Sequence, residues 1–495
     1  MAKKVVELQI PLNRVEGDLD IKVKIEDGVI TEAKSVGTLY RGFENILQGR
    51  DPLDALVITP RVCGICSISH LTAAVKALED AHGIIPPMQA VRFRNLSIMS
   101  ENLQSDIKQV FLMFMADFAD EYYKEYSFFE TAKKYYAPFK GELTKGLLNS
   151  TKEILKVIAY IGGQWPHTSH MVPGGLNVLA DDLEIFRIRL LIVKFKQWFE
   201  TEVLKTDSKS FLDLKSVADL ENFVAKNPES HLSIFYNISK ELDLFSMGKT
   251  GYAFINYGSL DLEEQKHLIP QSLYDTALHP LDISKISEDV TYAWYDASSD
   301  NLFESKTLPN REKENAYSFT KAPRYQNEAV QTGALGEELA LNNPLFKDLY
   351  ETYGDSVFVR EFARMIRPVR YLAFMEKEIE NIIKNKDDVV YEKPKFKKNA
   401  TGVGLTHAAR GALGHWIKIK NHKIENYQII SPTTWNGSPK DANGNFGAWE
   451  KALLGLKIKD VQNPMEMGHV IRSFDPCLVC TVHFIGSDKK VRLFT

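Results

Sequence analysis

Cysteine is scarce in this chain, and hallmarks of several protein classes are missing. Its 495 residues include four cysteines, too few for the disulfide framework of a secreted scaffold. No apolar run approaches the roughly 18 residues that a membrane-spanning helix requires. The 61 Lys and Arg residues nearly balance the 65 Asp and Glu residues, so no basic surface for nucleic acid or anionic lipid is expected. Residues 1–4 lead into a strand-like alternation rather than a signal-peptide core, which predicts a cytoplasmic protein.

The remaining composition is that of an ordinary folded protein, with 44% hydrophobic and 25% charged residues. Alternating apolar residues predict β-hairpins at 5–37 and 415–430, and helical periodicity dominates between them. Helices are expected after Cys66, in two pieces after Pro86-Pro87 that break near Asp117, at 182–204 behind an Asp181–Glu184 capping box, and at 355–386 with a kink at Pro368. The polar stretch 207–330 predicts irregular segments and short strands. No linker marks a domain boundary.

The four cysteines form two Cys-x-x-Cys pairs, Cys63 with Cys66 and Cys477 with Cys480. Buried cysteines can act as small hydrophobes, but packing does not require two spaced pairs. A redox dithiol suits the first pair, because the start of a following helix lowers thiol pKa, yet no βαβ pattern precedes it. A four-thiolate metal site would join the two ends of the fold across about 410 residues, which favours a buried redox metal centre over a structural zinc.

Both pairs stand within longer patterns. The first is Arg61-Val62-Cys63-Gly64-Ile65-Cys66 followed by His70, and the second is Asp475-Pro476-Cys477-Leu478-Val479-Cys480 followed by His483. Together they resemble the paired signatures of the [NiFe]-hydrogenase large subunit. Further segments agree in family order between residues 14 and 483: Arg14-Val15-Glu16-Gly17-Asp18, Tyr40-Arg41-Gly42-Phe43-Glu44, His167 with Pro173-Gly174-Gly175, Ala409-Arg410-Gly411-Ala412-Leu413-Gly414-His415-Trp416, and Pro432-Thr433-Thr434-Trp435-Asn436.

This resemblance implies both a fold and a cofactor. The fold would be α+β, mainly α, with a helical-bundle core and small peripheral β-sheets. The four cysteines Cys63, Cys66, Cys477 and Cys480 would bind nickel. Cys66 and Cys480 would also bridge to an iron that carries two cyanides and one carbon monoxide.

The resemblance also assigns the surroundings of this centre. His70 would lie beside the cofactor, and Arg410 and Thr433 would face the diatomic ligands, where cyanide needs hydrogen-bond donors. Asp475 would hold Arg410 by a charge-assisted pair. A separate Mg2+ or Fe2+ ion would be bound by Glu44, the carbonyl of Ile429 and His483, an oxygen-rich set that suits a hard cation.

The implied reaction is the heterolytic oxidation of H2, which requires a hydride acceptor and a base within about 3 Å of each other. Cys477 or Arg410 could be that base. Cys477 is favoured because arginine is almost never deprotonated in proteins. Glu16, the family's relay carboxylate, would then pass the proton toward solvent.

Electrons must leave through a partner, because the metal site consumes all four cysteines and no Gly-x-Gly-x-x-Gly dinucleotide signature is present. The resemblance implies an iron–sulfur small subunit in a heterodimer of the H2-uptake type. It also implies nickel-insertion proteins and a maturation endopeptidase. Two alternatives stay open: an H2 sensor with the same centre, and a binding protein stapled by zinc.

The endopeptidase leads to an expectation about the C-terminus. A charged tail that continued from a buried His483 would strand Lys489, Lys490 and Arg492 in the interior. We therefore expect residues 1–483 to form one interlocked catalytic domain and residues 484–495 to be removed on maturation.

Two segments depart from the family pattern. His407-Ala408-Ala409 stands where many members have Glu-Ala-Pro, so the pocket loses a φ-fixing residue and one source of rigidity. Ser105 stands at the position of the family's canopy Asp, with Asp106 one residue away. The Gln104-Ser105 form, together with the segment Phe474-Asp475-Pro476-Cys477-Leu478-Val479-Cys480-Thr481, resembles the cytoplasmic uptake and sensory branch more closely.

Overall fold

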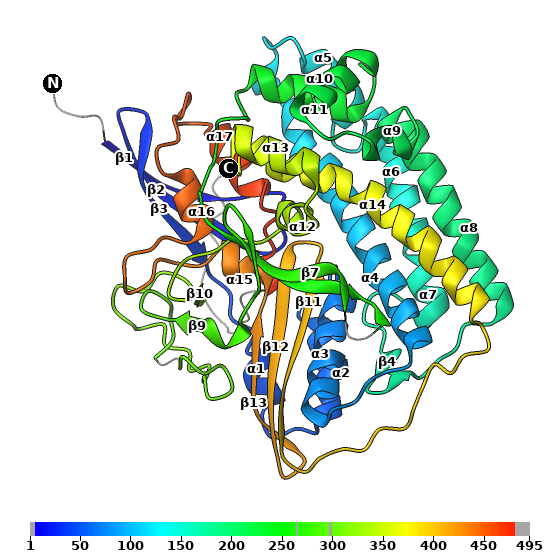
Figure 1. Cartoon of the computed structure of the whole chain (residues 1–495). Helices are drawn as coiled ribbons and strands as arrows, with labels where there is room; N and C mark the ends of the chain where they lie inside the picture. The colour runs from blue at the N-terminus through cyan, green and yellow to red at the C-terminus, as the bar shows by residue number, and fades with distance from the viewer. Residues whose placement is uncertain (1–4, 264–265, 297–298, 481–495) are drawn as a thin grey trace.

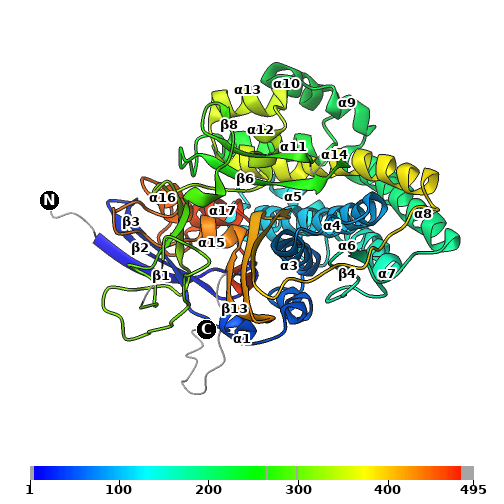
Figure 2. The same cartoon turned by 60° about the horizontal axis from the view of Figure 1, so that its bottom comes forward.

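The computed structural model describes residues 5–263, 266–296 and 299–480. Long helices gather on one side of the molecule, and small antiparallel sheets lie beside and below them, as Figure 1 and the turned view in Figure 2 show. This arrangement confirms the predicted α+β, mainly α class. Within the described residues, no helix is both long enough and apolar enough to cross a membrane.

The helical side is built around α14 (Val357–Lys384), which packs against α4 (Met88–Lys108) and α8 (Asp182–Trp198). The Asp181–Glu184 capping box starts α8 as predicted, and α14 continues through Pro368. The chain after α4 breaks beyond Ala119, close to the expected position. The other helices here are α5 (Phe129–Tyr136), α6 (Glu142–Ile154), α7 (Lys156–Gly162), α12 (Ala334–Ala340) and α13 (Pro344–Tyr353).

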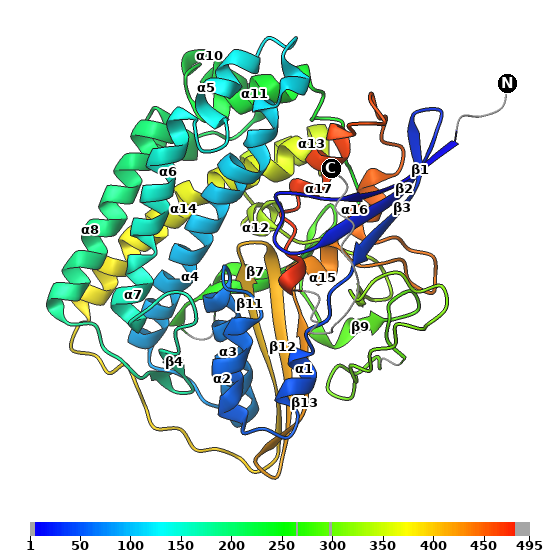
Figure 3. The same cartoon turned by 180° about the vertical axis from the view of Figure 1, so that it is seen from behind.

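A central three-stranded sheet consists of β11 (Ala400–Ala408), β12 (Gly411–Lys420) and β13 (Lys423–Ile430). The sequence predicts the last two strands but not β11. Helix α3 (Ser67–His82) packs along β11, as the view from behind in Figure 3 shows. This close approach depends on glycine, because a Cβ at Gly404 would lie 1.8 Å from the carbonyl oxygen of Ala73.

The predicted N-terminal hairpin is a meander of three strands, β1 (Val5–Pro11), β2 (Leu19–Glu26) and β3 (Val29–Gly37). Leu19, Ile21, Val23 and Ile25 alternate toward the core, as the period of two requires. Short helices connect and cover the sheets: α1 (Phe43–Leu47), α2 (Ala55–Ile58), α15 (Pro432–Asn436), α16 (Ala448–Leu453) and α17 (Met465–Arg472).

The prediction for 207–330 is wrong in its first part. That part forms α9 (Ser208–Leu212), α10 (Val217–Lys226) and α11 (His231–Glu241). Polar residues there serve as helix caps: Asp207 accepts from the Ser210 amide, and Ser216 accepts from the Asp219 amide. The remainder has the expected short strands, β6 (Phe254–Asp261), β7 (His267–Tyr274), β8 (Leu278–His279), β9 (Ile286–Asp289) and β10 (Ala322–Tyr325); β4 (Met171–Val172) and β5 (Gly175–Leu176) lie earlier.

Candidate metal centre

The two cysteine pairs meet where the ends of the fold come together. Cys63 and Cys66 lie in the turn before α3, and Cys477 follows α17. The Sγ atoms of Cys63 and Cys477 are 3.6 Å apart, and the three sulfurs lie within 4.8 Å of one another in the buried core. The backbone of Cys480 ends the described chain in the turn Leu478–Cys480. A metal ion could therefore bind ligands from both ends of the sequence.

The loop that carries Glu16 is paired with the second cysteine segment. Glu16 and Cys477 form a parallel bridge, in which the amide of Glu16 donates to Pro476 (3.2 Å) and the amide of Leu478 donates to Glu16 (2.7 Å). Gly17 permits this contact, because its φ is +85° and a Cβ there would lie 2.9 Å from the Val479 nitrogen. Burial, followed by the nearby Cys63, raises the pKa of Glu16.

Arg41 joins the two cysteine segments from the other side. Its Nη2 donates to the carbonyl of Val62, next to Cys63, and to the carbonyl of Val479, between Cys477 and Cys480. One guanidinium therefore fixes the backbone of both loops. The Tyr-Arg-Gly segment had pointed to the family, but its sequence carried no sign of this bridging contact.

Arg410 lies over the cysteines in the turn between β11 and β12. Its Nε donates to the Asp475 carbonyl at 3.1 Å, and its Nη2 lies 3.1 Å from Oδ1 of Asp475. Its Nη1 is buried and has no hydrogen-bond partner among the described residues. Burial opposes its charge, but Asp475 and the cysteine sulfurs raise the pKa of Arg410 well above its ordinary value. The hydroxyl of Thr433 accepts from the Cys477 amide at 3.1 Å.

His70 and a buried glutamate support the start of α3. Nδ1 of His70 is 3.1 Å from Nε2 of His415, and burial lowers the pKa of His70 to about 4. Glu101, on α4, accepts from the amides of Ile68 and Ser69 at 2.8 and 2.9 Å. This carboxylate caps the helix that begins directly after Cys66, and burial raises its pKa to about 7. Glu101 was not identified from the sequence.

Glu44 lies beside Ile429, as the resemblance implies, but the contact in the structure is with the amide of Ile429 and not with its carbonyl. Glu44 is buried, and one oxygen accepts from the amide of Ile429 at 2.9 Å rather than lying free on a helix surface. The other oxygen lies 3.3 Å from Nζ of Lys321, which is also 3.2 Å from Glu288. Burial raises the pKa of Glu288, and Oε1 of Glu288 has no partner in the described part of the chain. His483 lies outside the described residues.

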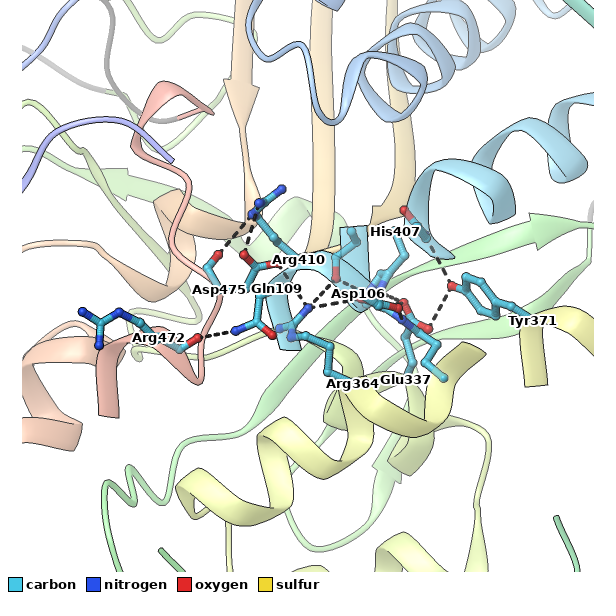
Figure 4. A network of polar contacts seen from close by, with 12 residues as sticks. Asp106, Gln109, Glu337, Arg364, Tyr371, His407, Arg410, Arg472 and Asp475 are labelled. Atoms are coloured by element: carbon cyan, nitrogen blue, oxygen red, sulfur yellow. Dashed lines mark hydrogen bonds and ion pairs between the residues drawn. The ribbon is translucent and has the colours of Figure 1, made fainter. Parts of the chain in front are cut away.

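The two departures from the family pattern belong to one buried network, drawn in Figure 4. Asp106 binds Arg367 through both carboxylate oxygens and lies 3.5 Å from Arg364. Nδ1 of His407 lies 2.7 Å from Glu337. The network reaches Arg410 through Asp475, not through the position of Ser105. Its arginines on α14 were missed, since the sequence shows them only as helix charges at ordinary spacing.

This set of side chains defines the class of protein: a metalloenzyme with a buried thiolate centre, a cationic group facing it and a carboxylate beside it. The residues fit a nickel–iron centre. Thiolates suit these soft metals, and Nη1 of Arg410, which has no hydrogen-bond partner in the described part of the chain, is a donor that an anionic ligand can use.

Comparison with known proteins gives the family. A model of the nickel-dependent hydrogenases matches residues 41–137 and 115–483. The periplasmic [NiFeSe] hydrogenase large subunit of Desulfomicrobium baculatum is 31% identical over 97% of this chain and 95% of its own length. The uptake hydrogenase large subunit of Rhodobacter capsulatus is 26% identical with the same coverage. The reduced Ni-Fe-Se hydrogenase structure from D. vulgaris Hildenborough has a TM-score of 0.83 and 30% identity, covering 97% of this chain and 100% of that one. The chain belongs to the nickel-dependent hydrogenase family, and it is a large subunit of that family.

Proposed function

We propose that this hydrogenase subunit oxidises H2 and passes the electrons to an iron–sulfur small subunit in a heterodimer of the uptake type. The observation that carries the proposal is the buried cluster of Cys63, Cys66 and Cys477, together with an Nη1 of Arg410 that has no hydrogen-bond partner among the described residues. The relatives include large subunits named as uptake and as quinone-reactive hydrogenases, and these names support H2 oxidation as the direction of the reaction.

The four cysteines would hold nickel, with Cys66 and Cys480 shared with an iron. When bound, this centre supplies a Lewis acid that polarises H2 and accepts electrons. Arg410 and Thr433 would donate hydrogen bonds to the diatomic ligands of the iron. Asp475 orients the Arg410 guanidinium, to which it is paired at 3.1 Å.

The chain's own groups would move the proton. The raised pKa of Arg410 keeps its guanidinium protonated, so it cannot accept a proton, which leaves the Cys477 sulfur as the acceptor. Glu16 is the next carrier, because its backbone is bridged to Cys477 and its raised pKa favours binding a proton. From there the proton would pass to solvent.

We also propose a Mg2+ or Fe2+ ion bound by Glu44, the Ile429 carbonyl and His483. The second buried carboxyl group, Glu288, whose Oε1 has no partner among the described residues, supports an oxygen-rich site for a hard cation beside Glu44.

Three finer proposals concern the whole protein. Residues 1–483 would form one catalytic unit, and 484–495 would be removed by a maturation endopeptidase after nickel insertion; the family match ends at residue 483.

A cytoplasmic location is our proposal too, although one relative is named periplasmic. Fractionation of the native host by enzyme activity tests the location.

Metal analysis tests the function. Protein matured in its native host and purified with its partner should contain about one nickel per chain and oxidise H2. Cys66→Ser and Cys480→Ser should each lose both properties, because each sulfur would serve two metals. Zinc as the only metal, or full nickel occupancy with normal turnover in either variant, would refute the assignment.

A further inference from the structure

Two arginines of α14 bind a single backbone carbonyl beside the metal centre. Nη1 of Arg364 donates to the carbonyl of Ala409 at 3.0 Å, and Nη2 of Arg367 donates to the same oxygen. The two arginines are three residues apart and therefore lie on one face of the helix. Both side chains are at most 2% exposed. The carbonyl they bind immediately precedes Arg410.

Carboxyl groups lie beside both arginines, and Figure 4 shows Arg364 between Asp106 and Asp475. Arg367 binds Asp106 at 2.8 and 2.5 Å and Glu337 at 2.9 Å. Glu337 also lies 2.7 Å from His407 and accepts from Tyr371. Burial by itself would raise the pKa of Glu337, but Arg367 and His407 lower it to about 2, so this carboxylate is ionised.

Arg364 is also linked to the guanidinium of Arg410 through the carboxyl group of Asp475. Its Nη1 lies 3.3 Å from Oδ2 of Asp475, whose Oδ1 pairs with Nη2 of Arg410 at 3.1 Å. Arg364 therefore contacts both the backbone and the carboxylate that aim Arg410. In this network the three arginines Arg364, Arg367 and Arg410 pair with the carboxyl groups of Asp106, Glu337 and Asp475.

The turn itself explains why such support is needed. Ala408 pairs with Gly411, so Ala409 and Arg410 alone form the tip of the β11–β12 hairpin. Gly411 has a φ of +122° and adds no stiffness of its own. A proline at position 409 would fix φ there, but this chain has alanine. Hydrogen bonds from two directions on the Ala409 carbonyl fix the peptide plane that joins Ala409 to Arg410.

We propose that Arg364 and Arg367 are positioning residues for Arg410 and replace a φ-fixing proline at position 409. The inference rests on the proposed function, in which Arg410 faces the cyanide ligands of the iron. On this proposal, the two arginines supply the rigidity that the alanine at position 409 would otherwise leave out.

The infrared bands of the cyanide ligands provide the test, because they report hydrogen bonding from Arg410 independently of activity. In Arg364→Gln these bands should shift and broaden, and H2 oxidation should fall roughly 100-fold, as expected for a misplacement of about 1 Å. Adding Ala409→Pro to this variant should restore the band positions. Arg370→Gln is the control, since Arg370 lies on the same helix and pairs with Glu338, outside the network.

Arg410→Lys distinguishes a failure of this inference from a failure of the proposed function on which it rests. If the bands do not move in Arg410→Lys, the placement of Arg410 is wrong and the proposed function loses its support. If they move in Arg410→Lys but stay unchanged in Arg364→Gln, or if Ala409→Pro restores nothing, the positioning role is refuted. Should Arg364→Gln not fold, Arg364→Lys takes its place, because it keeps the charge but loses the planar fork.

Discussion

Gly404→Ala tests how closely the metal centre depends on the packing of α3 against β11. The new Cβ would lie 1.8 Å from the Ala73 carbonyl oxygen and 2.4 Å from the Ala77 nitrogen, both backbone atoms. Side-chain adjustment cannot relieve such contacts. The helix must move away from the strand, and α3 begins directly after Cys66.

The size of the displacement follows from these distances. Real Cβ contacts are almost never shorter than 3.0 Å, so the Ala73 oxygen must retreat by roughly 1.2 Å. Overpacking of this kind costs about 1–3 kcal/mol of stability. A misplacement of about 1 Å at a reacting group costs about 100-fold in rate. We therefore expect a modest loss of stability but a large loss of turnover and of nickel.

Leu405→Ala is the matched control. Leu405 is the next residue of β11 and packs on the opposite face, in a cluster with Trp416 and Tyr257. Its truncation should cost about 2–5 kcal/mol, more than Gly404→Ala, without pushing α3. Nickel content, H2-dependent dye reduction and thermal unfolding are measured for both. The displacement argument is wrong if Gly404→Ala keeps the parental turnover. It is also wrong if the loss of turnover in Gly404→Ala and Leu405→Ala is proportional to their loss of thermal stability.

Three further predictions follow from the site. Glu16→Gln should keep its nickel but lose net H2 oxidation, while H2/D2 exchange survives better; parental turnover would place the relay elsewhere. Glu44→Gln should retain nickel but lose the second divalent ion in elemental analysis, and an unchanged ion content would exclude Glu44 as its ligand. The intact mass of the active enzyme should correspond to a chain ending at His483, and active protein ending at Thr495 would contradict the maturation proposal.

Part of this site could be predicted because its signals are local. The spacing of Cys63 and Cys66 and of Cys477 and Cys480 is visible in single segments. The fold class is implied by the family resemblance, the N-terminal strands follow from periodicity, and the structure agrees with both. The glycine of Arg14-Val15-Glu16-Gly17 has a physical role that only the structure reveals. Gly17 lets the Glu16 loop lie against Val479.

The rest could not be predicted because it depends on pairing between distant segments. Arg364 and Arg367 appear in the sequence as two ordinary charges on a helix, and their partners Asp106 and Glu337 lie more than twenty residues away in other helices. Strand β11 was missed for a related reason. Its Gly402 and Gly404 lower strand propensity, yet they are needed where α3 packs closely along the strand.

The buried ion network around Arg410 is better explained by its role in positioning Arg410 than by a contribution to the folding stability of the protein. Exchanging buried ion pairs for apolar side chains of similar volume is often neutral or stabilising by about 1–4 kcal/mol. A cluster of three arginines and three carboxylates is therefore a costly way to hold α14 in place. It does what apolar packing cannot: it directs hydrogen bonds at one carbonyl and at Asp475, and so fixes both the backbone and the guanidinium of Arg410. A donor that must face a small anionic ligand gains from such directional support, because its direction, and not only its burial, decides whether the bond forms.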